Sequence, residues 1–483
     1  MIPNTLRNDI KRGIIATASA RYSDYVLQLV VSAVLARILT PEQFGTVAVV
    51  TVLLAFFKLV GDAGLGPAVI QRRDLTIDDE SALFSLSLTL ALILGLLFAA
   101  STPLVASFYA EDEYFELVPV MAIALTLNIG SVVPQALLRK RRQFGLLGLV
   151  VVCSHILGGS VGIVLAVRGW GAMSLVVKAV VSSVAIFVSA LFLSRVRLRP
   201  SFQLSLYRSI ASYAGFQFLF QFINYFSRNL DKLLIGRYLG QASLGYYEKS
   251  YRLMMLPLQT LTHVITPVLH PVMSTVQDDK ERIARGFLTI TRLLALIGFP
   301  LSVFLYFTAR EIVLIIFGGQ WEQSVPVFTI LSWSVGLQMV LSSTGSIFQV
   351  SGRTDLLFLS GSISALFMVG CIVIGLIIGS TEAVAFALVA AFMVNFFQGT
   401  GILVVSVLRG RYRDFIVTLV APTISAAGVF GALWIVTETL DFSAYSLWMS
   451  FLIKTIIGTV SFIAMLIATR QLSYIRTLLG RRR

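Results

Sequence analysis

Nine basic side chains lie inside long apolar segments of this chain, where a charge is costly to bury. A charged group at the centre of a bilayer costs about 2.5–3.5 kcal/mol on insertion scales, so an intramembrane charge indicates a functional site. Arginine offers a phosphate a planar fork and lysine a compact charge, which favours binding of a phosphate-bearing anion. The nine residues are Arg21, Lys58, Lys178, Arg228, Lys232, Lys249, Arg252, Arg292 and Lys454.

Depth along the segments separates these residues. Arg21, Lys58 and Arg252 lie deep and are predicted to line a polar cavity. For two of them internal pairing is the alternative, because Asp62 lies one turn from Lys58 and Glu248 one turn from Arg252. Three others lie near segment ends, from which a long basic side chain can extend to the interface. These are Lys232, Arg292 and Lys454.

Polar residues recur at helical spacing in two segments. Arg21, Asp24 and Gln28 share one face of the first segment. A second polar face steps by three or four residues through Gln217, Gln221, Asn224, Arg228 and Asp231. An offset of about 200 residues aligns the two faces, with Gln221 at Arg21 and Asn224 at Asp24. Two such faces are expected to line one basic, aqueous cleft.

The predicted substrate site combines these faces with the charges of two neighbouring segments. Its substrate-binding residues are Arg21, Lys58, Arg228, Lys249, Arg252, Gln221 and Asn224. Asp24 and Asp231 are candidate ion-coupling residues. If transport is coupled to an ion, no residue pattern selects between H⁺ and Na⁺.

Other chemistry-bearing residues form no constellation. The three histidines have no ligand spacing, and the two cysteines, Cys153 and Cys371, lie in apolar segments, so neither a metal site nor a disulfide framework is expected. There is no glycine loop followed by Lys-Ser or Lys-Thr, so ATP is not the evident driver. We therefore expect no catalytic residues and no cofactor apart from a coupling ion.

The elements that position these residues are transmembrane helices. Hydrophobic residues make up 57% of the chain and charged residues only 13%, whereas soluble domains carry about 25% charged residues. A spanning helix needs about 20 apolar residues, and on that scale the chain has about 14 segments. The predicted class is therefore an all-helical (all-α) polytopic membrane protein. The segments lie near 13–38, 43–69, 81–107, 114–138, 145–167, 171–194, 208–235, 242–272, 286–308, 323–350, 355–378, 381–407, 413–437 and 446–469.

Internal repetition divides these segments into two halves. The run from Arg37 to Gly45 matches Arg237 to Gly245, and Phe108 to Glu113 matches Phe317 to Glu322. The offset spans an even number of helices, so the halves share one orientation, as in transporters built from parallel repeats. The predicted organisation is an N-terminal lobe at 1–200, a C-terminal lobe at 201–410, and two further helices with a basic tail at 411–483.

Loop charges predict the topology. Alternate loops are rich in lysine and arginine, whereas the loops on the other side hold only Arg37, Arg168, Arg237 and Arg310. Because basic loops stay in the cytoplasm, both termini are expected there. Most of the net charge of +14 is thus topological and requires no nucleic acid.

Several motifs resemble those of a known family. They are Arg37-Ile-Leu-Thr-Pro-Glu-Gln-Phe-Gly45, Gly64-Leu-Gly-Pro-Ala-Val-Ile-Gln71, Asn229-Leu-Asp-Lys-Leu-Leu-Ile-Gly-Arg237 and Phe317-Gly-Gly-Gln-Trp321. In order and spacing the chain resembles the polysaccharide transporter family of Wzx-type flippases, near the branch of colanic-acid and teichuronic-acid exporters. That family belongs to the multidrug/oligosaccharidyl-lipid/polysaccharide exporter superfamily.

The resemblance implies both a fold and a function. It implies two six-helix lobes in a V arrangement plus two extra helices, in a bacterial inner membrane. The implied substrate is an undecaprenyl-diphosphate-linked oligosaccharide, flipped to the periplasmic leaflet by alternating access. Related lipid II flippases use basic residues on the first, second and eighth helices, where Arg21, Lys58 and Arg252 lie. A polysaccharide polymerase and chain-length proteins are further candidate partners beside membrane lipid.

Other functions remain open at this stage. An ion-coupled drug exporter of the same superfamily is one, although its usual cargoes are cations. A membrane polymerase or ligase for lipid-linked sugars is an enzymatic alternative, but such enzymes usually carry a larger periplasmic loop. A scaffold without transport activity leaves the buried charges unexplained.

Overall fold

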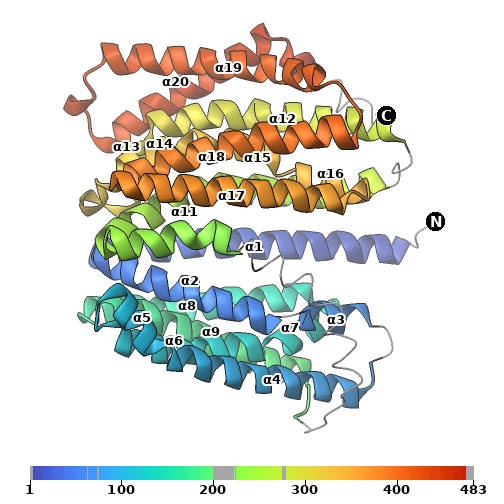
Figure 1. The fold of residues 1–483 in the computed structure, drawn as a ribbon, viewed down its shortest axis with the longest axis vertical. Coiled ribbons are helices and arrows are strands. Elements are labelled where there is room, and N and C mark those ends of the chain that lie inside the picture. Colours follow the sequence, from blue (N-terminus) through green and yellow to red (C-terminus); the bar gives the residue numbers. More distant parts are fainter. Residues whose placement is uncertain are drawn as a thin grey trace. The chain divides into compact units, whose positions relative to one another are not determined.

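The structure is a computed structural model that describes residues 4–62, 64–72, 75–198, 222, 225–274 and 279–474. Every regular element in these residues is a helix, as predicted. Figure 1 shows the long helices of each half running side by side. Helices are the expected solution because hydrocarbon offers no partner to a backbone N–H or C=O, and a helix pairs these groups internally.

The helices that qualify as membrane spans match the sequence prediction closely. Ten in the described residues are long and apolar enough, or eleven if the bent pair Ser324–Ser332 and Ser334–Val350 forms one span. These correspond to all predicted segments except the first, seventh and eighth. The first and eighth segments coincide with the charge-bearing helices α1 (Asn4–Ile38) and α11 (Gln241–Ser274). Most of the seventh lies outside the described residues.

Contacts divide the chain into two compact units, Met1–Gly245 and Tyr246–Arg483, here called unit 1 and unit 2. The boundary falls inside α11, later than the predicted lobe boundary near residue 200. The boundary lies after residue 200 because the helical residues 225–238 pack on α2 (Pro41–Asp62) and α5 (Thr102–Tyr109), which belong to the first unit. The Tyr109 hydroxyl donates to the Leu233 carbonyl at 3.1 Å, and the Tyr225 hydroxyl donates to the Val52 carbonyl.

Unit 1 is built from paired helices. Helix α4 packs on α6, α8 packs on both α1 and α9, and α3 packs on α7. Helix α4 begins at a capping box, in which Thr76 and Asp79 satisfy each other's backbone N–H groups. Besides α1, its helices are α2 (Pro41–Asp62), α3 (Leu65–Gln71), α4 (Ile77–Ala100), α5 (Thr102–Tyr109), α6 (Tyr114–Gly130), α7 (Val132–Lys140), α8 (Phe144–Val167) and α9 (Ala172–Ser194).

Three loops predicted to lie on the cytoplasmic side meet at one end of unit 1. Arg141, after α7, pairs with Glu80 in the first turn of α4 at 3.3 Å. The same guanidinium donates to the carbonyl of Ser194, the last residue of α9, at 2.6 Å. These contacts bring the segment before α4 and the segments after α7 and α9 to one end of the unit.

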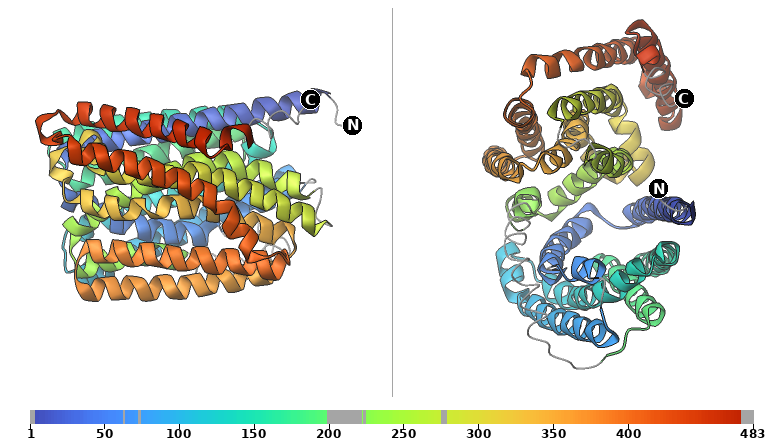
Figure 2. Two further views of the ribbon diagram at one scale, coloured as in Figure 1. Left: turned by 90° about the horizontal axis from the view of Figure 1, so that it is seen from above. Right: turned by 90° about the vertical axis from the view of Figure 1, so that its right-hand side faces the viewer.

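Unit 2 contains the rest of α11 and the elements after it. Helix α12 packs on α15 and α19, α17 packs on α18, and α20 packs on α19 (Figure 2). The C-terminal pair of helices is thus part of this unit. The elements are α12 (Lys280–Phe307), α13 (Ala309–Phe317), η1 (Gly319–Trp321), α14 (Ser324–Ser332), α15 (Ser334–Leu341), α16 (Thr344–Val350), α17 (Thr354–Ile378), α18 (Thr381–Gly401), η2 (Ile402–Val407), α19 (Tyr412–Thr439), η3 (Phe442–Ala444) and α20 (Leu447–Ala468).

The repeated motif of the two halves meets its own copy in unit 1. A Cβ atom on Gly45 would lie 1.8 Å from the Gln241 carbonyl oxygen, and one on Gly245 would lie 1.9 Å from the Pro41 carbonyl oxygen. Pro41 and Gln241 begin α2 and α11, and they occupy equivalent positions in the repeat. The first turns of these helices therefore touch backbone to backbone, which explains why glycine ends the motif in both halves.

Candidate functional site

The polar face of α1 contacts α8 through a short carboxylate–imidazole interaction. His155 Nδ1 lies 2.5 Å from Asp24 Oδ1, and the Gln28 side-chain amide donates to Asp24 Oδ2 at 2.9 Å. The side chains of His155 and Asp24 are 26% and 17% exposed, so both are shielded without being fully enclosed. The pair therefore links α1 to α8 through polar side chains.

Four of the nine basic residues inside the segments form no hydrogen bond, ion pair or ring contact in the part of the chain that the structure describes. One of them, Lys58, still interacts electrostatically with Asp62. Two are exposed and two are half-buried. Asp62 lies one turn from Lys58, and Glu248 one turn from Arg252, but neither pair forms an ion pair among the described residues. The four are Arg21, Lys58, Arg228 and Arg252.

The other predicted site residues lie elsewhere. Gln221 and Asn224 fall outside the described residues. Asp231 is buried, with 2% of its surface exposed. Lys249, also 2% exposed, lies in unit 2 with its ammonium 5.0 Å from the centre of the Phe317 ring and 5.4 Å from that of Trp321. These ring contacts stabilise a cation through the aromatic faces and place Lys249 in the packing of unit 2.

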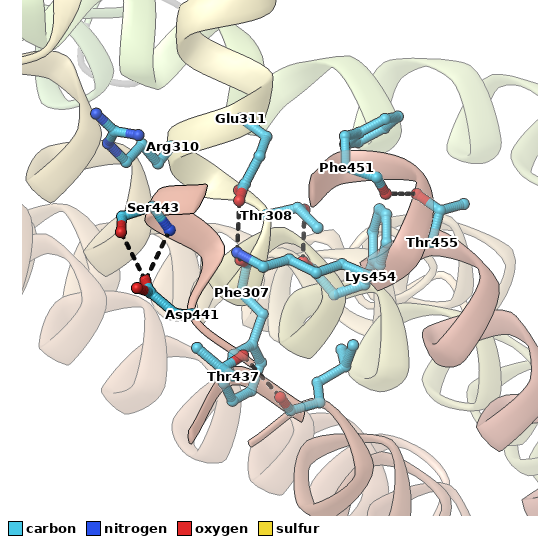
Figure 3. Close-up of polar contacts among 12 residues, drawn as sticks. Phe307, Thr308, Arg310, Glu311, Thr437, Asp441, Ser443, Phe451, Lys454 and Thr455 are labelled. Carbon is cyan, nitrogen blue, oxygen red and sulfur yellow. Dashed lines mark hydrogen bonds and ion pairs between the residues drawn. The ribbon is translucent and has the colours of Figure 1, made fainter. Parts of the chain in front are cut away.

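Lys454 is a basic residue whose surroundings differ from the sequence prediction. Its ammonium lies 2.5 Å from Glu311 Oε1 and donates to the Phe307 carbonyl at 2.9 Å, as Figure 3 shows. The ring of Phe442 covers it at 4.8 Å. The side chains of Lys454 and Glu311 are only 8% and 5% exposed, so the prediction that Lys454 extends to the interface is wrong. The pair joins α20 to α13.

Arg292 is also held by protein groups. Its Nε donates to Gln471 Oε1 at 2.9 Å, and its guanidinium lies 4.1 Å from the centre of the Tyr474 ring. This contact ties α12 to the segment after α20. The two remaining basic residues, Lys178 and Lys232, interact with other groups of the protein. Five of the nine charges therefore interact with protein groups, and the other four form no hydrogen bond, ion pair or ring contact in the described residues.

Sequence reasoning did not identify His155 as the partner of Asp24, or Glu311 as the partner of Lys454. His155 lacks metal-ligand spacing, which is the pattern that usually singles out a histidine in a sequence. A useful signal would have been that His155 and Asp24 both lie inside apolar segments, where an ionisable group requires a partner. No group of three or more potential metal-binding side chains occurs in the described residues.

The chain is similar to several known proteins. The profile of a family described as "Polysaccharide biosynthesis protein" matches residues 34–326. The chain is 27% identical over 383 residues to the teichuronic acid biosynthesis protein TuaB of Bacillus subtilis, which covers 78% of this chain and 79% of that protein. It is 26% identical over 381 residues to the succinoglycan biosynthesis transport protein ExoT of Rhizobium meliloti, covering 79% and 77%.

A solved structure has the same fold. The lipid II flippase MurJ in its inward closed conformation superposes with a TM-score of 0.76, covering 95% of this chain and 99% of that chain at 14% identity. The family profile extends over more than half of the chain, and the resemblance inferred from the sequence motifs is confirmed. This chain therefore belongs to the polysaccharide biosynthesis protein family.

Proposed function

We propose that this chain is a flippase that moves an undecaprenyl-diphosphate-linked oligosaccharide from the cytoplasmic to the periplasmic leaflet. The family and its transport-named relative support transport rather than catalysis. The observation that carries the proposal is a set of four basic residues that form no hydrogen bond, ion pair or ring contact within the described residues, namely Arg21, Lys58, Arg228 and Arg252.

The lack of hydrogen bonds and ion pairs within the described residues distinguishes these four side chains physically. A cation among apolar helices is stabilised by a partner or by water, and the other five intramembrane charges have protein partners. A diphosphate supplies the missing negative charge, and arginine can bind it with two parallel hydrogen bonds. We therefore propose basic residues of this set as ligands of the diphosphate headgroup, while the glycan occupies water and the lipid tail stays in the bilayer.

The membrane potential assists such a movement. Outward transfer of an anion from an inside-negative cell is favoured by about 2.3 kcal/mol per charge per 100 mV. In the alternating-access cycle that we propose, the site faces the cytoplasm, binds the headgroup, and then opens to the other side. The binding energy of the four cations offsets the cost of bringing a diphosphate into a low-dielectric region.

Leaflet transfer in proteoliposomes tests the proposal. Undecaprenyl-diphosphate-linked glycan is placed in one leaflet, and its appearance in the other is measured with a glycan-specific reagent that does not cross the bilayer. Arg21→Ala and Arg252→Ala are each expected to lower the transfer rate at least about tenfold, because each removes a charge-assisted bond. Chemically unchanged substrate is expected in the second leaflet.

A matched control comes from an arginine outside the spans. Arg310 pairs with Glu322 at 3.0 Å and is exposed, so Arg310→Ala is expected to transfer glycan at the parent rate. Equal transfer by all variants at equal melting temperature would remove the headgroup assignment. Chain elongation or glycosyl transfer by the purified parent would instead identify a polymerase or ligase.

The cellular setting is proposed with the function. We place the chain in the bacterial inner membrane with both termini in the cytoplasm, on the basis of its basic loops. A polysaccharide polymerase and chain-length proteins would then receive the flipped repeat unit on the periplasmic side.

A further inference from the structure

Four arginines just beyond the ends of membrane spans adopt a backbone conformation that residues other than glycine rarely take. In the described part of the chain, five residues other than glycine have a positive φ, and four of them are arginines with φ between 53° and 58°. Glycine is the usual residue in this left-handed region, because a Cβ atom there crowds the backbone. The four are Arg142, Arg195, Arg409 and Arg470.

Each of these arginines follows a helix that qualifies as a membrane span, one or two residues after the end of that helix. The spans end at Lys140, Ser194, Val407 and Ala468. The four arginines are exposed, and their side chains form no hydrogen bond, ion pair or ring contact within the described residues. No protein contact in this part of the chain therefore explains why arginine occupies these positions.

The same backbone conformation is taken by other residues at the opposite ends of the helices. On the side predicted to be periplasmic, a positive φ belongs to Ala110 and to glycines. On the basic side it belongs to the four arginines and to Gly64 and Gly352. In the described residues, arginine in this conformation is thus confined to the basic side. The glycines on the predicted periplasmic side are Gly169, Gly171, Gly240, Gly318 and Gly379.

Neither membrane topology nor the helix dipole requires arginine at these positions. Topology needs basic residues only somewhere in a loop, and Arg197 supplies one after Arg195 without a positive φ. The helix dipole favours a cation at every helix C-terminus. After α8, however, Arg168 has a φ of −79° and the next residue, Gly169, takes the positive φ. Because the chain can place a charge beside a glycine, the strained arginines indicate a function of their own.

The phosphate of a lipid headgroup fits the chemistry of these side chains. A guanidinium binds phosphate through two parallel hydrogen bonds, and the cytoplasmic leaflet of a membrane carries anionic lipid. In unit 1 the ends of two spans meet, since Arg141 donates to the Ser194 carbonyl at 2.6 Å. Arg142 and Arg195 are the next residues along the chain, so two strained arginines lie at the same end of this unit.

We propose that Arg142, Arg195, Arg409 and Arg470 bind the phosphates of anionic phospholipids in the cytoplasmic leaflet. The strained backbone places each guanidinium at the headgroup, and the bound lipid offsets the strain. These residues lie outside the spans, and the inference does not depend on the proposed transport function.

Substitution by glycine separates backbone strain from charge. Arg142→Gly combined with Arg195→Gly relieves the backbone, so this double variant is expected to melt about 2 °C above the parent in lipid-free dodecyl maltoside. Its affinity for phosphatidylglycerol, measured by native mass spectrometry in the same detergent, is expected to fall at least about fivefold. Its affinity for phosphatidylcholine is expected to stay at the parent value. Arg409→Gly combined with Arg470→Gly repeats the test in unit 2, with the same expected result.

Two variants serve as matched controls. Ala110→Gly changes a residue that has a φ of 57° but no charge. It is expected to raise the melting temperature and to leave the affinity for phosphatidylglycerol unchanged. Arg197→Gln removes an exposed charge from a residue without a positive φ, and it is expected to match the parent in both measurements. Inorganic phosphate is added as a competitor and is expected not to displace the lipid.

Several results would overturn the proposal. Equal affinity of the parent for phosphatidylglycerol and phosphatidylcholine, or parent-like affinity for phosphatidylglycerol in both double variants, would remove the lipid assignment. An equal loss in Arg197→Gln would mean that binding follows net charge and not position. Displacement by inorganic phosphate would identify a site for the free ion. Double variants that melt below the parent without lipid would show that the arginines stabilise the protein itself.

Discussion

At the scale of single residues, the intramembrane charges of this chain fall into two groups by their contacts. Lys454, Lys249 and Arg292 contact a carboxylate, aromatic rings or an amide within unit 2. Arg21 and Lys58 in unit 1 have no hydrogen bond or ion pair in the described residues. Charges of the first group contribute to helix packing, and those of the second are the ones that we propose to bind the headgroup.

The Lys454–Glu311 pair predicts a difference between single and double variants. Lys454→Met leaves Glu311 buried without its cation, which costs about 3–5 kcal/mol of stability. Replacing both partners, as Lys454→Met with Glu311→Leu, removes both charges and is expected to restore most of the loss. Thermal melting in detergent compares the melting temperatures of the parent, the single variant and the double variant. A double variant that melts as low as the single variant contradicts this account of the pair.

At the scale of elements, the turn between α19 and α20 holds a ring over Lys454. Asp441 accepts hydrogen bonds from the Ser443 backbone N–H at 3.0 Å and from its hydroxyl at 2.6 Å. These bonds shape the short helix η3, which carries Phe442 to within 4.8 Å of the Lys454 ammonium. The two hydrogen bonds from Ser443 also hold the pKa of Asp441 below its ordinary range.

A lowered pKa gives a defined direction of pH dependence. The folded state favours the ionised Asp441 carboxylate, so its contribution to stability is present above about pH 4 and is lost as the pH falls. The parent is expected to melt higher than Asp441→Asn at pH 6, and the two should converge at pH 3. If the difference in melting temperature is the same at pH 6 and pH 3, the charge of Asp441 is not its cause.

The contact between the first turns of α2 and α11 predicts intolerance to a methyl group. Gly45→Ala and Gly245→Ala would each place a Cβ less than 2 Å from a backbone carbonyl oxygen, where no side chain can move away. Both variants are expected to lower the folded yield and the melting temperature. Gly370→Ala on α17 is the matched control, because its Cβ would meet nothing within 4 Å. Parent-like melting of both motif variants would show that these helices can separate freely.

At the scale of the whole molecule, helix directions determine which loops face each compartment. In unit 1, Arg141 contacts Glu80 and Ser194, which brings the segment before α4 and the segments after α7 and α9 to one end. The acidic loop after α5 includes Glu111 and Glu113, and its charge predicts that it lies on the opposite side. Burial and the charges of Glu111, Glu42 and Glu116 raise the pKa of Glu113, as expected for a cluster of acids at one surface.

Thiol labelling in intact cells stripped of their outer membrane tests the topology. Cys153 and Cys371 are first replaced by alanine, since they are the two cysteines of the chain. Glu111→Cys is expected to react with a membrane-impermeant maleimide, and Arg411→Cys only after the membrane is permeabilised. The reverse pattern would invert the proposed orientation of the chain.

Much of the helical architecture could be read from the sequence because it depends on local properties. Spans follow from runs of apolar residues, whose ends in α8 or α20 need no knowledge of neighbours. Helix direction follows from loop charge, and the repeat from recurrence of the Arg37–Gly45 pattern. The same motifs were sufficient to indicate the family that the profile confirms.

Partners of individual side chains are set by packing between distant segments. Asp24 and His155 are 131 residues apart, and Lys454 and Glu311 are 143 apart, so no local pattern connects them. For this reason the sequence determined the helices, their alternation and the presence of nine costly charges. Only the tertiary structure decided which charges find a protein partner, because helix packing alone brings such groups within hydrogen-bond distance.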